Sequence, residues 1–202
     1  MTSSLALAAS MKAAGVRRAV VLGGSGLHHE IAALGIVVYD VGEIDRHGWR
    51  SPRPEAAIAL GGWPDARLGD IETVGMLAAA GFPLYVTSLE PGFPNATGYQ
   101  AGAGMMIAAA RALHRFEVIV CGKPSASYAA AVLDALPLQA RVLMVGDSLN
   151  ADVGLAGQMG ADSLLLLGGR PFEPGSATHI PTFVAADLTV DPKPLAESAL
   201  DR

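Results

Sequence analysis

Hydrophobic and polar positions follow two alternating patterns along this chain. Short runs of consecutive apolar residues are separated by longer stretches in which apolar residues recur every three or four positions. The first pattern predicts buried β-strands, and the second predicts amphipathic helices. Strands are expected at 18–22, 36–39, 56–60, 84–87, 117–121, 141–145, 163–167 and 182–186. Helices are expected at 27–34, 66–80, 105–113, 125–135 and 151–159.

This alternation of strands and helices predicts an α/β fold with a parallel sheet. Strand 163–167 is almost entirely leucine, so we expect it in the centre of a sheet with both faces buried. Segment 91–104 is rich in Gly and Pro and predicts a shaped loop. Helix 125–135 is expected to bury one apolar stripe, formed by Tyr128, Val132, Leu133 and Leu136.

Composition narrows the classes of protein that fit. The 202 residues carry a net charge of -5, and no basic stripe stands out, so nucleic acid is not an expected partner. Cys121 is the single cysteine, which excludes a disulfide framework and a cysteine-rich zinc site. No apolar run is long enough to span a bilayer, and the first ten residues lack a basic segment typical of a signal peptide. We therefore expect a soluble, cytoplasmic protein with no membrane partner.

The strongest candidate for chemistry follows strand 141–145 and reads Gly146-Asp147-Ser148-Leu149-Asn150-Ala151-Asp152. Asp147 stands at the carboxyl end of a strand, where open α/β sheets bind ligands, and Gly146 permits a tight turn there. Two carboxylates and the Asn150 amide on one loop could hold a hard cation such as Mg²⁺. Alternatively, Asn150 and Asp152 only cap the following helix.

A second candidate, Lys123, lies in Gly122-Lys123-Pro124-Ser125, directly after strand 117–121. Its point charge suits a phosphate or a carboxylate partner. Because both loops follow strands, we expect Lys123 and Asp147 to face the same crevice.

Several stretches, taken in chain order, resemble one known family. GKPS at 122–125 and VLMVGDSLNADVGLAGQMGADSLLLLGG at 142–169 resemble the third and fourth motifs of the haloacid-dehalogenase (HAD) superfamily. TSLEPGFPNATGYQAGAG at 87–104 and AVVLGGSGLHHEIAALG at 19–35 are similar to segments of its large-capped, NagD-like branch, class IIA. The resemblance covers essentially the whole chain. It implies a Rossmann-like HAD core, represented here by its C-terminal part only, with a large α/β cap domain.

The resemblance also implies a domain division and a set of roles. Residues 1–15 would be a remnant core helix, 16–115 the cap domain and 116–202 the C-terminal part of the core. Lys123 would be catalytic and neutralise the transferring phosphoryl group, whereas Asp147 and Asp152 would bind the Mg²⁺ cofactor. Gly146, Ser148 and Asn150 would support that loop. The cap would contact substrate through Glu90, Asn95, Gly102 and Gly104.

One element of the family's chemistry is missing from these residues. The nucleophile of the family is the first Asp of an Asp-x-Asp motif, and no Asp-x-Asp occurs in the 202 residues. We therefore expect the segment with the first two motifs to be absent and the chain to be inactive alone. A gene model that starts too late is the explanation we favour, over a fragment that needs a separate N-terminal partner and over a degenerate pseudo-enzyme.

The sequence thus predicts a Mg²⁺-dependent HAD-type phosphatase of small phosphate esters, in a form that lacks its nucleophile. A catalytically dead phosphate-binding or scaffold protein is one alternative. A Rossmann-like nucleotide-binding module is another, although Gly23, Gly24 and Gly26 lack the G-x-G-x-x-G spacing. The expected partners are a small phosphorylated metabolite and a second copy, through the cap domain.

Overall fold

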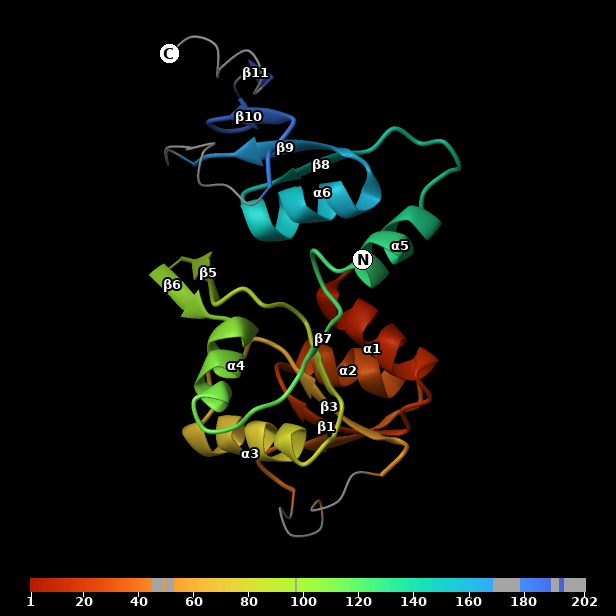
Figure 1. Cartoon of the computed structure of the whole chain (residues 1–202), viewed down its shortest axis with the longest axis vertical. Helices are drawn as coiled ribbons and strands as arrows, with labels where there is room; N and C mark the ends of the chain where they lie inside the picture. Colours follow the sequence, from red (N-terminus) through yellow and green to blue (C-terminus); the bar gives the residue numbers. More distant parts are fainter. Residues whose placement is uncertain (45–48, 50–52, 97, 169–178, 190–192, 195–202) are drawn as a thin grey trace. The chain divides into compact units, whose positions relative to one another are not determined.

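A computed structural model describes residues 1–44, 49, 53–96, 98–168, 179–189 and 193–194. The chain forms two compact units, a first unit of residues 1–122 and a second unit of residues 123–202. Each is described by itself (Figure 1). Both are α/β structures built on mainly parallel sheets, which confirms the predicted fold class.

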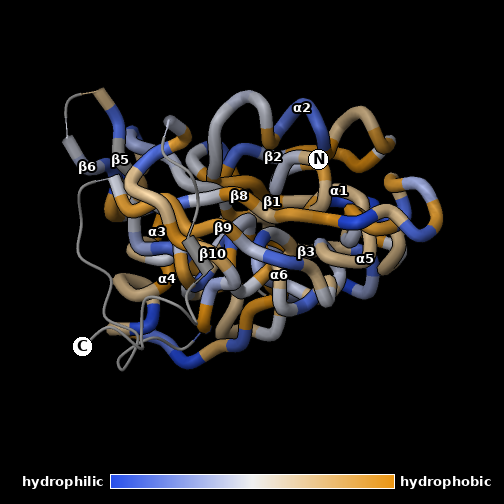
Figure 2. Tube along the Cα trace, turned by 90° about the horizontal axis from the view of Figure 1, so that it is seen from above, coloured by the Kyte–Doolittle hydropathy of each residue, from blue (hydrophilic) through white to orange (hydrophobic). Residues whose placement is uncertain are grey.

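A five-stranded parallel sheet forms the centre of the first unit, with strand order β2-β1-β3-β4-β7. Strands β1 (Arg18–Leu22) and β3 (Ala56–Leu60) begin and end where the apolar runs predict. They are hydrophobic along most of their length (Figure 2) and are almost completely buried. The flanking strands are β2 (Val37–Asp40), β4 (Leu84–Val86) and β7 (Ile119–Val120).

Helices cover both faces of this sheet, because successive strand residues point to opposite sides. On one face, α1 (Ser3–Ala13) and α2 (Ser25–Ala33) pack against Ala19 and Val21. On the other face, α3 (Leu68–Ala79) and α4 (Ala103–Arg111) pack against Val20 and Leu22. The first unit therefore has three layers and two separate apolar clusters.

The Gly- and Pro-rich segment 91–104 contains structure that the sequence does not predict. Instead of a loop, it forms an antiparallel hairpin of β5 (Gly92–Asn95) and β6 (Gly98–Ala101). Gly98 has a φ of +139°, which glycine tolerates and which permits the turn. Proline occurs in strands mainly at sheet edges, and a Gly- and Pro-rich segment is usually read as a loop. The composition of this segment therefore did not predict a hairpin.

The second unit contains a four-stranded sheet with the order β11-β10-β9-β8. Strands β8 (Leu143–Gly146), β9 (Asp162–Leu166) and β10 (Phe183–Ala185) are parallel, and β11 (Lys193–Pro194) is antiparallel. Its helices are α5 (Ala126–Asp134) and α6 (Gly154–Met159), which ends at Gly160 in the left-handed conformation. As predicted for the leucine-rich strand, β9 lies inside the sheet.

The division between the units differs from the expected boundary at 115. Strand β7 pairs with β4 in the first sheet, so the segment before Gly122 belongs to the first unit. Helix α1, expected as a remnant of the core, buries Leu7 and Met11 in the apolar cluster of this same unit. An apolar strand such as β7 carries no signal of which sheet it joins, so the sequence could not place it.

The predicted apolar stripe of α5 is only partly buried. Tyr128 is buried as expected, but Leu133 and Leu136 are exposed. Among the helices that the structure describes, none is long and apolar enough to cross a membrane.

Candidate functional site

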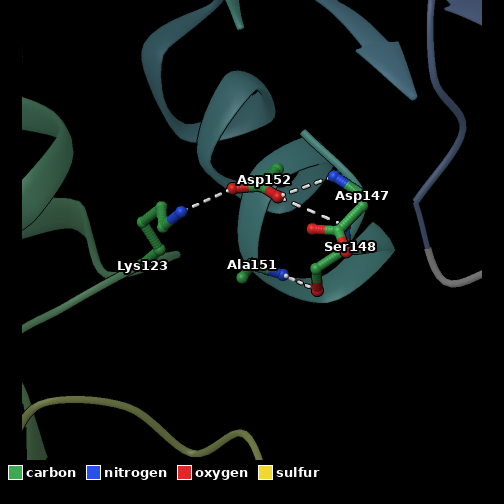
Figure 3. Close-up of polar contacts among 5 residues, drawn as sticks. All are labelled: Lys123, Asp147, Ser148, Ala151 and Asp152. Atoms are coloured by element: carbon green, nitrogen blue, oxygen red, sulfur yellow. Dashed lines mark hydrogen bonds and ion pairs between the residues drawn. The ribbon is translucent and has the colours of Figure 1, made fainter. Parts of the chain in front are cut away.

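The predicted site residues of the second unit meet at the carboxyl end of β8. Lys123 precedes α5, and Asp152 lies 29 residues further along the chain. The Lys123 Nζ donates a hydrogen bond to Asp152 Oδ1 at 2.6 Å (Figure 3). The Asp152 side chain is 7% exposed and that of Lys123 is 35% exposed. The ion pair is therefore buried at its carboxylate and open to solvent at its cation.

The second oxygen of Asp152 organises the loop that follows β8. Asp152 Oδ2 accepts hydrogen bonds from the backbone N–H groups of Asp147 and Ser148, both at 3.1 Å (Figure 3). Charge-assisted bonds of this kind are stronger than neutral ones. With Lys123 on the other oxygen, both oxygens of the carboxylate are engaged. Asp152 thus holds the loop that presents Asp147, whose own side chain is exposed.

Gly146 is required by this arrangement. A Cβ at this position would overlap the carboxylate of Asp152. Only a residue without a side chain allows the carboxylate to reach the N–H groups of the next two residues. The predicted supporting role of Gly146 therefore has a steric basis.

The turn after β8 differs from the expected helix 151–159. A π-helical turn, η1 (Leu149–Val153), comes first, and α6 begins only at Gly154. Ser148 is the N-cap, since its hydroxyl accepts a hydrogen bond from the N–H of Ala151 at 3.1 Å. The alternative in which Asn150 and Asp152 only cap the helix is wrong for Asp152, which binds the preceding loop instead.

Among the described residues, this loop does not by itself complete a cation site. Mg²⁺ favours one or two carboxylates together with water and phosphate oxygens. Asp147 offers such a carboxylate, but both oxygens of Asp152 already accept hydrogen bonds. Within the described ranges, no group of three His, Cys, Asp or Glu side chains is placed to hold a metal ion. The metal-binding roles of Asp147 and Asp152 therefore both stay predictions.

The predicted substrate residues lie in the first unit, around the start of α4. Gly102 donates its N–H to Pro91 O at 2.8 Å, and Gly104 donates to Glu90 O at 3.0 Å. A Cβ on Gly102 would lie 2.6 Å from Glu90 O, and one on Gly104 would overlap Leu89 O. The two glycines therefore allow the loop to pack tightly against the helix.

Asn95 stands at the turn of the hairpin. Its Nδ2 donates to Gln100 Oε1 across the two strands at 2.9 Å, and the residue is exposed. The structure thus shows hairpin and loop contacts for the four predicted substrate residues, whose roles in binding stay predictions.

His179 is a neighbour of the second unit's site that sequence reasoning missed. Gly154 is a common neighbour of His179 and of Pro124, the residue that follows Lys123. A Cβ built on Gly154 would lie 3.2 Å from His179 Nε2 and 3.1 Å from Pro124 Cβ. No sequence motif predicts this proximity. It arises because the chain returns to the site just before β10.

Cys121 directly follows strand β7, and its side chain is buried. Burial raises the pKa of its thiol, while hydrogen bonds from Ser10 and the Val86 backbone oppose that change. Burial also raises the pKa of Tyr85, with a smaller contribution from the charge of Cys121. Both groups are neutral at pH 7.

Residues 120–190 match the family described as HAD-hydrolase-like. No curated protein matches the chain. Among solved structures, a hypothetical protein from Pyrococcus horikoshii OT3 has a TM-score of 0.77 and 26% identity. The match covers 91% of this chain and 70% of that one.

Two further structures have named activities. A 4-nitrophenylphosphatase from Thermotoga maritima has a TM-score of 0.72 and 26% identity, covering 93% of this chain and 69% of that one. A glycerol phosphate phosphatase from Mycobacterium tuberculosis in complex with magnesium has a TM-score of 0.72 and 25% identity. The match covers 93% of this chain but only 56% of that enzyme, so the chain spans little more than half of its length.

Proposed function

We propose that this chain, which belongs to the HAD superfamily and has the fold of its NagD-like class IIA members, forms part of a phosphatase of small phosphate esters. The observation that carries this proposal is the ion pair of Lys123 with Asp152 beside Asp147. Lys123 lies in the loop before α5 and Asp152 in the π-helical turn η1, and they meet at the end of a sheet where α/β proteins bind ligands. The neighbours that are phosphatases support the same chemistry.

The charges of this site suit phosphoryl transfer, which depends on positioning and on neutralising negative charge. Asp152 fixes the Lys123 side chain through its Oδ1, so the ammonium group is oriented before a ligand arrives. Its solvent-exposed part can then meet a phosphate oxygen. A preoriented cation avoids the cost of reorganisation during the reaction.

Asp147 is the residue that we propose to hold Mg²⁺, since its carboxylate is exposed at the end of β8. When bound, the ion would neutralise charge on the phosphoryl oxygens. Asp147 depends on Asp152 for its position, because the N–H of Asp147 is bound to Asp152 Oδ2. One carboxylate therefore orients both the cationic side chain and the metal ligand.

The nucleophile is proposed to come from outside these 202 residues, because no Asp-x-Asp occurs within them. A covalent phosphoenzyme needs such a group. The purified chain with Mg²⁺ should therefore show no turnover of 4-nitrophenyl phosphate. Robust turnover by the chain itself would contradict this assignment.

The proposal is tested on a longer product. The DNA upstream of the Met1 codon is sequenced, and any in-frame extension that encodes an apolar strand followed by Asp-x-Asp is expressed with the chain. We expect Mg²⁺-dependent hydrolysis of 4-nitrophenyl phosphate by that product. Lys123→Met should lower kcat/KM by about 10²-fold or more, whereas Lys12→Met, on α1, should not. A folded extended product without turnover would refute the phosphatase proposal.

A non-catalytic phosphate-binding protein is the second candidate, favoured by the lack of Asp-x-Asp in the chain. It predicts that inorganic phosphate binds the 202-residue chain, and that Lys123→Met abolishes binding, whatever lies upstream. Thermal shifts with NAD or ATP, and none with phosphate, would instead support the nucleotide-binding module.

A further inference from the structure

His179 lies close to both segments that form the ion pair of the second unit. Gly154 follows Asp152 by two residues, and Pro124 directly follows Lys123. The position of a Cβ on Gly154 is 3.2 Å from His179 Nε2, 3.4 Å from His179 Cδ2 and 3.1 Å from Pro124 Cβ. These distances leave little room for a side chain at Gly154. The edge of the imidazole and the proline ring therefore both lie over the first residue of α6.

Hydrogen bonds a few residues further along the chain hold His179 in place. The N–H of Thr182 donates to Ser163 Oγ, and the N–H of Ser163 donates to Thr182 Oγ1, both at 3.1 Å. Ser163 is buried in β9, and Pro181 is buried as well. Because proline has a fixed φ and Thr182 is bonded to β9, the segment that carries His179 has little conformational freedom. The position of His179 beside α6 is therefore supported by the sheet.

Lys123 needs support at its backbone as well as at its ammonium group. Lysine has a long, flexible side chain, so an ion pair at its end leaves many conformations of the loop open. Asp152 binds Nζ at 2.6 Å, and hydrogen bonds of its second oxygen hold it in η1. The loop of Lys123 must therefore keep a fixed distance from η1. Pro124 is the residue of that loop that packs on Gly154, directly after η1.

We infer that His179 is a positioning residue for Lys123. Its ring packs beside Gly154 and keeps Pro124 against the start of α6, so that Nζ of Lys123 reaches Asp152. This role rests on the proposed function, in which Lys123 meets a phosphate oxygen. His179 acts only through Lys123 and contacts no reacting atom. A residue that only stabilised the fold would instead affect Lys123 and strand β9 alike.

Nuclear magnetic resonance of the full chain tests this role without a ligand. The chain has three lysines, Lys12, Lys123 and Lys193, so their Nζ signals are assigned by single substitutions to methionine. Exchange of the Lys123 ammonium protons with water measures how often the ion pair opens. Lys12, whose Nζ donates to Leu34 O at 2.9 Å in the first unit, is the internal reference.

His179→Ala should speed the exchange at Lys123 at least about threefold, because the loop loses its packing partner. Exchange at Lys12 and at the backbone amides of β9 should not change. His179→Phe, which keeps a planar ring beside Gly154, should restore most of the protection. His29→Ala, at an exposed position on α2, is the matched control and should have no effect.

Two glycines of α6 provide an independent test. Gly154→Ala adds a methyl group that crowds His179 and Pro124, so exchange at the ion pair should become faster. Gly157→Ala, where nothing lies within 4 Å of the Cβ, should have no effect. In a His179→Ala background, Gly154→Ala should have less effect, because one of its two crowded neighbours is gone.

Unchanged exchange at Lys123 in His179→Ala, or faster exchange that the β9 amides match, would overturn the inference. A Lys123 signal that exchanges as fast as a free lysine in the unmodified chain would also overturn it, since the ion pair would then be absent. None of these measurements needs turnover. An extended product that folds but is inactive refutes the phosphatase and does not alter the effect of His179 on Lys123, so the two proposals can fail separately.

Discussion

At the scale of single residues, the site depends on one carboxylate with several partners. Asp152 accepts hydrogen bonds from Lys123 and from the N–H groups of Asp147 and Ser148. A buried group with this many partners costs more to disrupt than any single bond suggests, since each partner is left unsatisfied. Asp152 therefore helps to fix the position of Asp147 through the N–H of that residue.

Asp152→Asn tests this dependence. The amide can keep the two backbone N–H donors on its oxygen, but its NH₂ group would then face the ammonium of Lys123. We expect a loss of about 1–3 kcal/mol in the free energy of unfolding. Urea denaturation measures it, with Asp162→Asn, at the exposed start of β9, as the control. Equal stability of the two variants would contradict the proposed organising role.

Cys121 gives a prediction for pH. Because burial raises its pKa in the folded chain, the unfolded chain loses the proton first as pH rises past about 8.5. The resulting stability is present below that pH and is lost above it. Cys121→Ala should flatten the fall of Tm between about pH 8 and 9.5, which calorimetry measures. The raised pKa of Tyr85 also lowers stability as pH rises, but at higher pH. If Cys121→Ala leaves the slope of Tm against pH unchanged, the loss of stability is due to Tyr85 rather than to Cys121.

At the scale of elements, glycines decide how closely loops approach helices. Gly104, in the first turn of α4, has no room for a Cβ because the carbonyl groups of Leu89 and Glu90 pack against it. Gly157, within α6, has nothing within 4 Å of its Cβ position. The two helical glycines should therefore respond to alanine in opposite directions.

Gly104→Ala should lower the free energy of unfolding by more than about 1 kcal/mol, because the loop before the hairpin must move. Gly157→Ala should raise it by about 0.5–1 kcal/mol, because alanine is the better helix former. Thermal or urea denaturation of the two variants decides, and a stabilising Gly104→Ala would show that the loop yields easily.

Sequence patterns predicted those elements whose signal is local. The apolar runs 18–22 and 56–60 are strands β1 and β3 with the expected bounds, because each is buried on both faces. Segment 91–104 was expected as a loop, since the pairing of Phe93 with Gln100 depends on hairpin geometry rather than on composition. The proximity of Lys123 to the loop after β8 could be predicted, because both segments directly follow apolar strands. The engagement of both Asp152 oxygens did not, because it requires the π-helical turn.

At the scale of the whole molecule, the described residues of the two units differ in how they bury apolar side chains. In the part of the chain that the structure describes, the first unit contains two clusters of buried apolar residues, one on each face of its sheet. The second exposes leucines on α5 and at the edge of β8. Since apolar burial drives folding, the first unit should be the more stable one.

This difference predicts the behaviour of the separate units. Residues 1–122 expressed alone should unfold cooperatively, with a defined Tm and little binding of a hydrophobic dye. Residues 123–202 alone should show no cooperative transition and should bind the dye strongly. A sharp thermal transition of the second unit alone would contradict this expectation.

The close approach of Gly146 to Asp152 also limits how related sequences can diverge. A side chain at position 146 and a carboxylate at position 152 would occupy the same space. The two positions should therefore change together: relatives that lose this glycine should have a smaller residue in place of the aspartate, and a lone replacement of the glycine should be rare. Covariation between these positions would record the steric constraint across evolution, independently of whether a given relative has kept its activity.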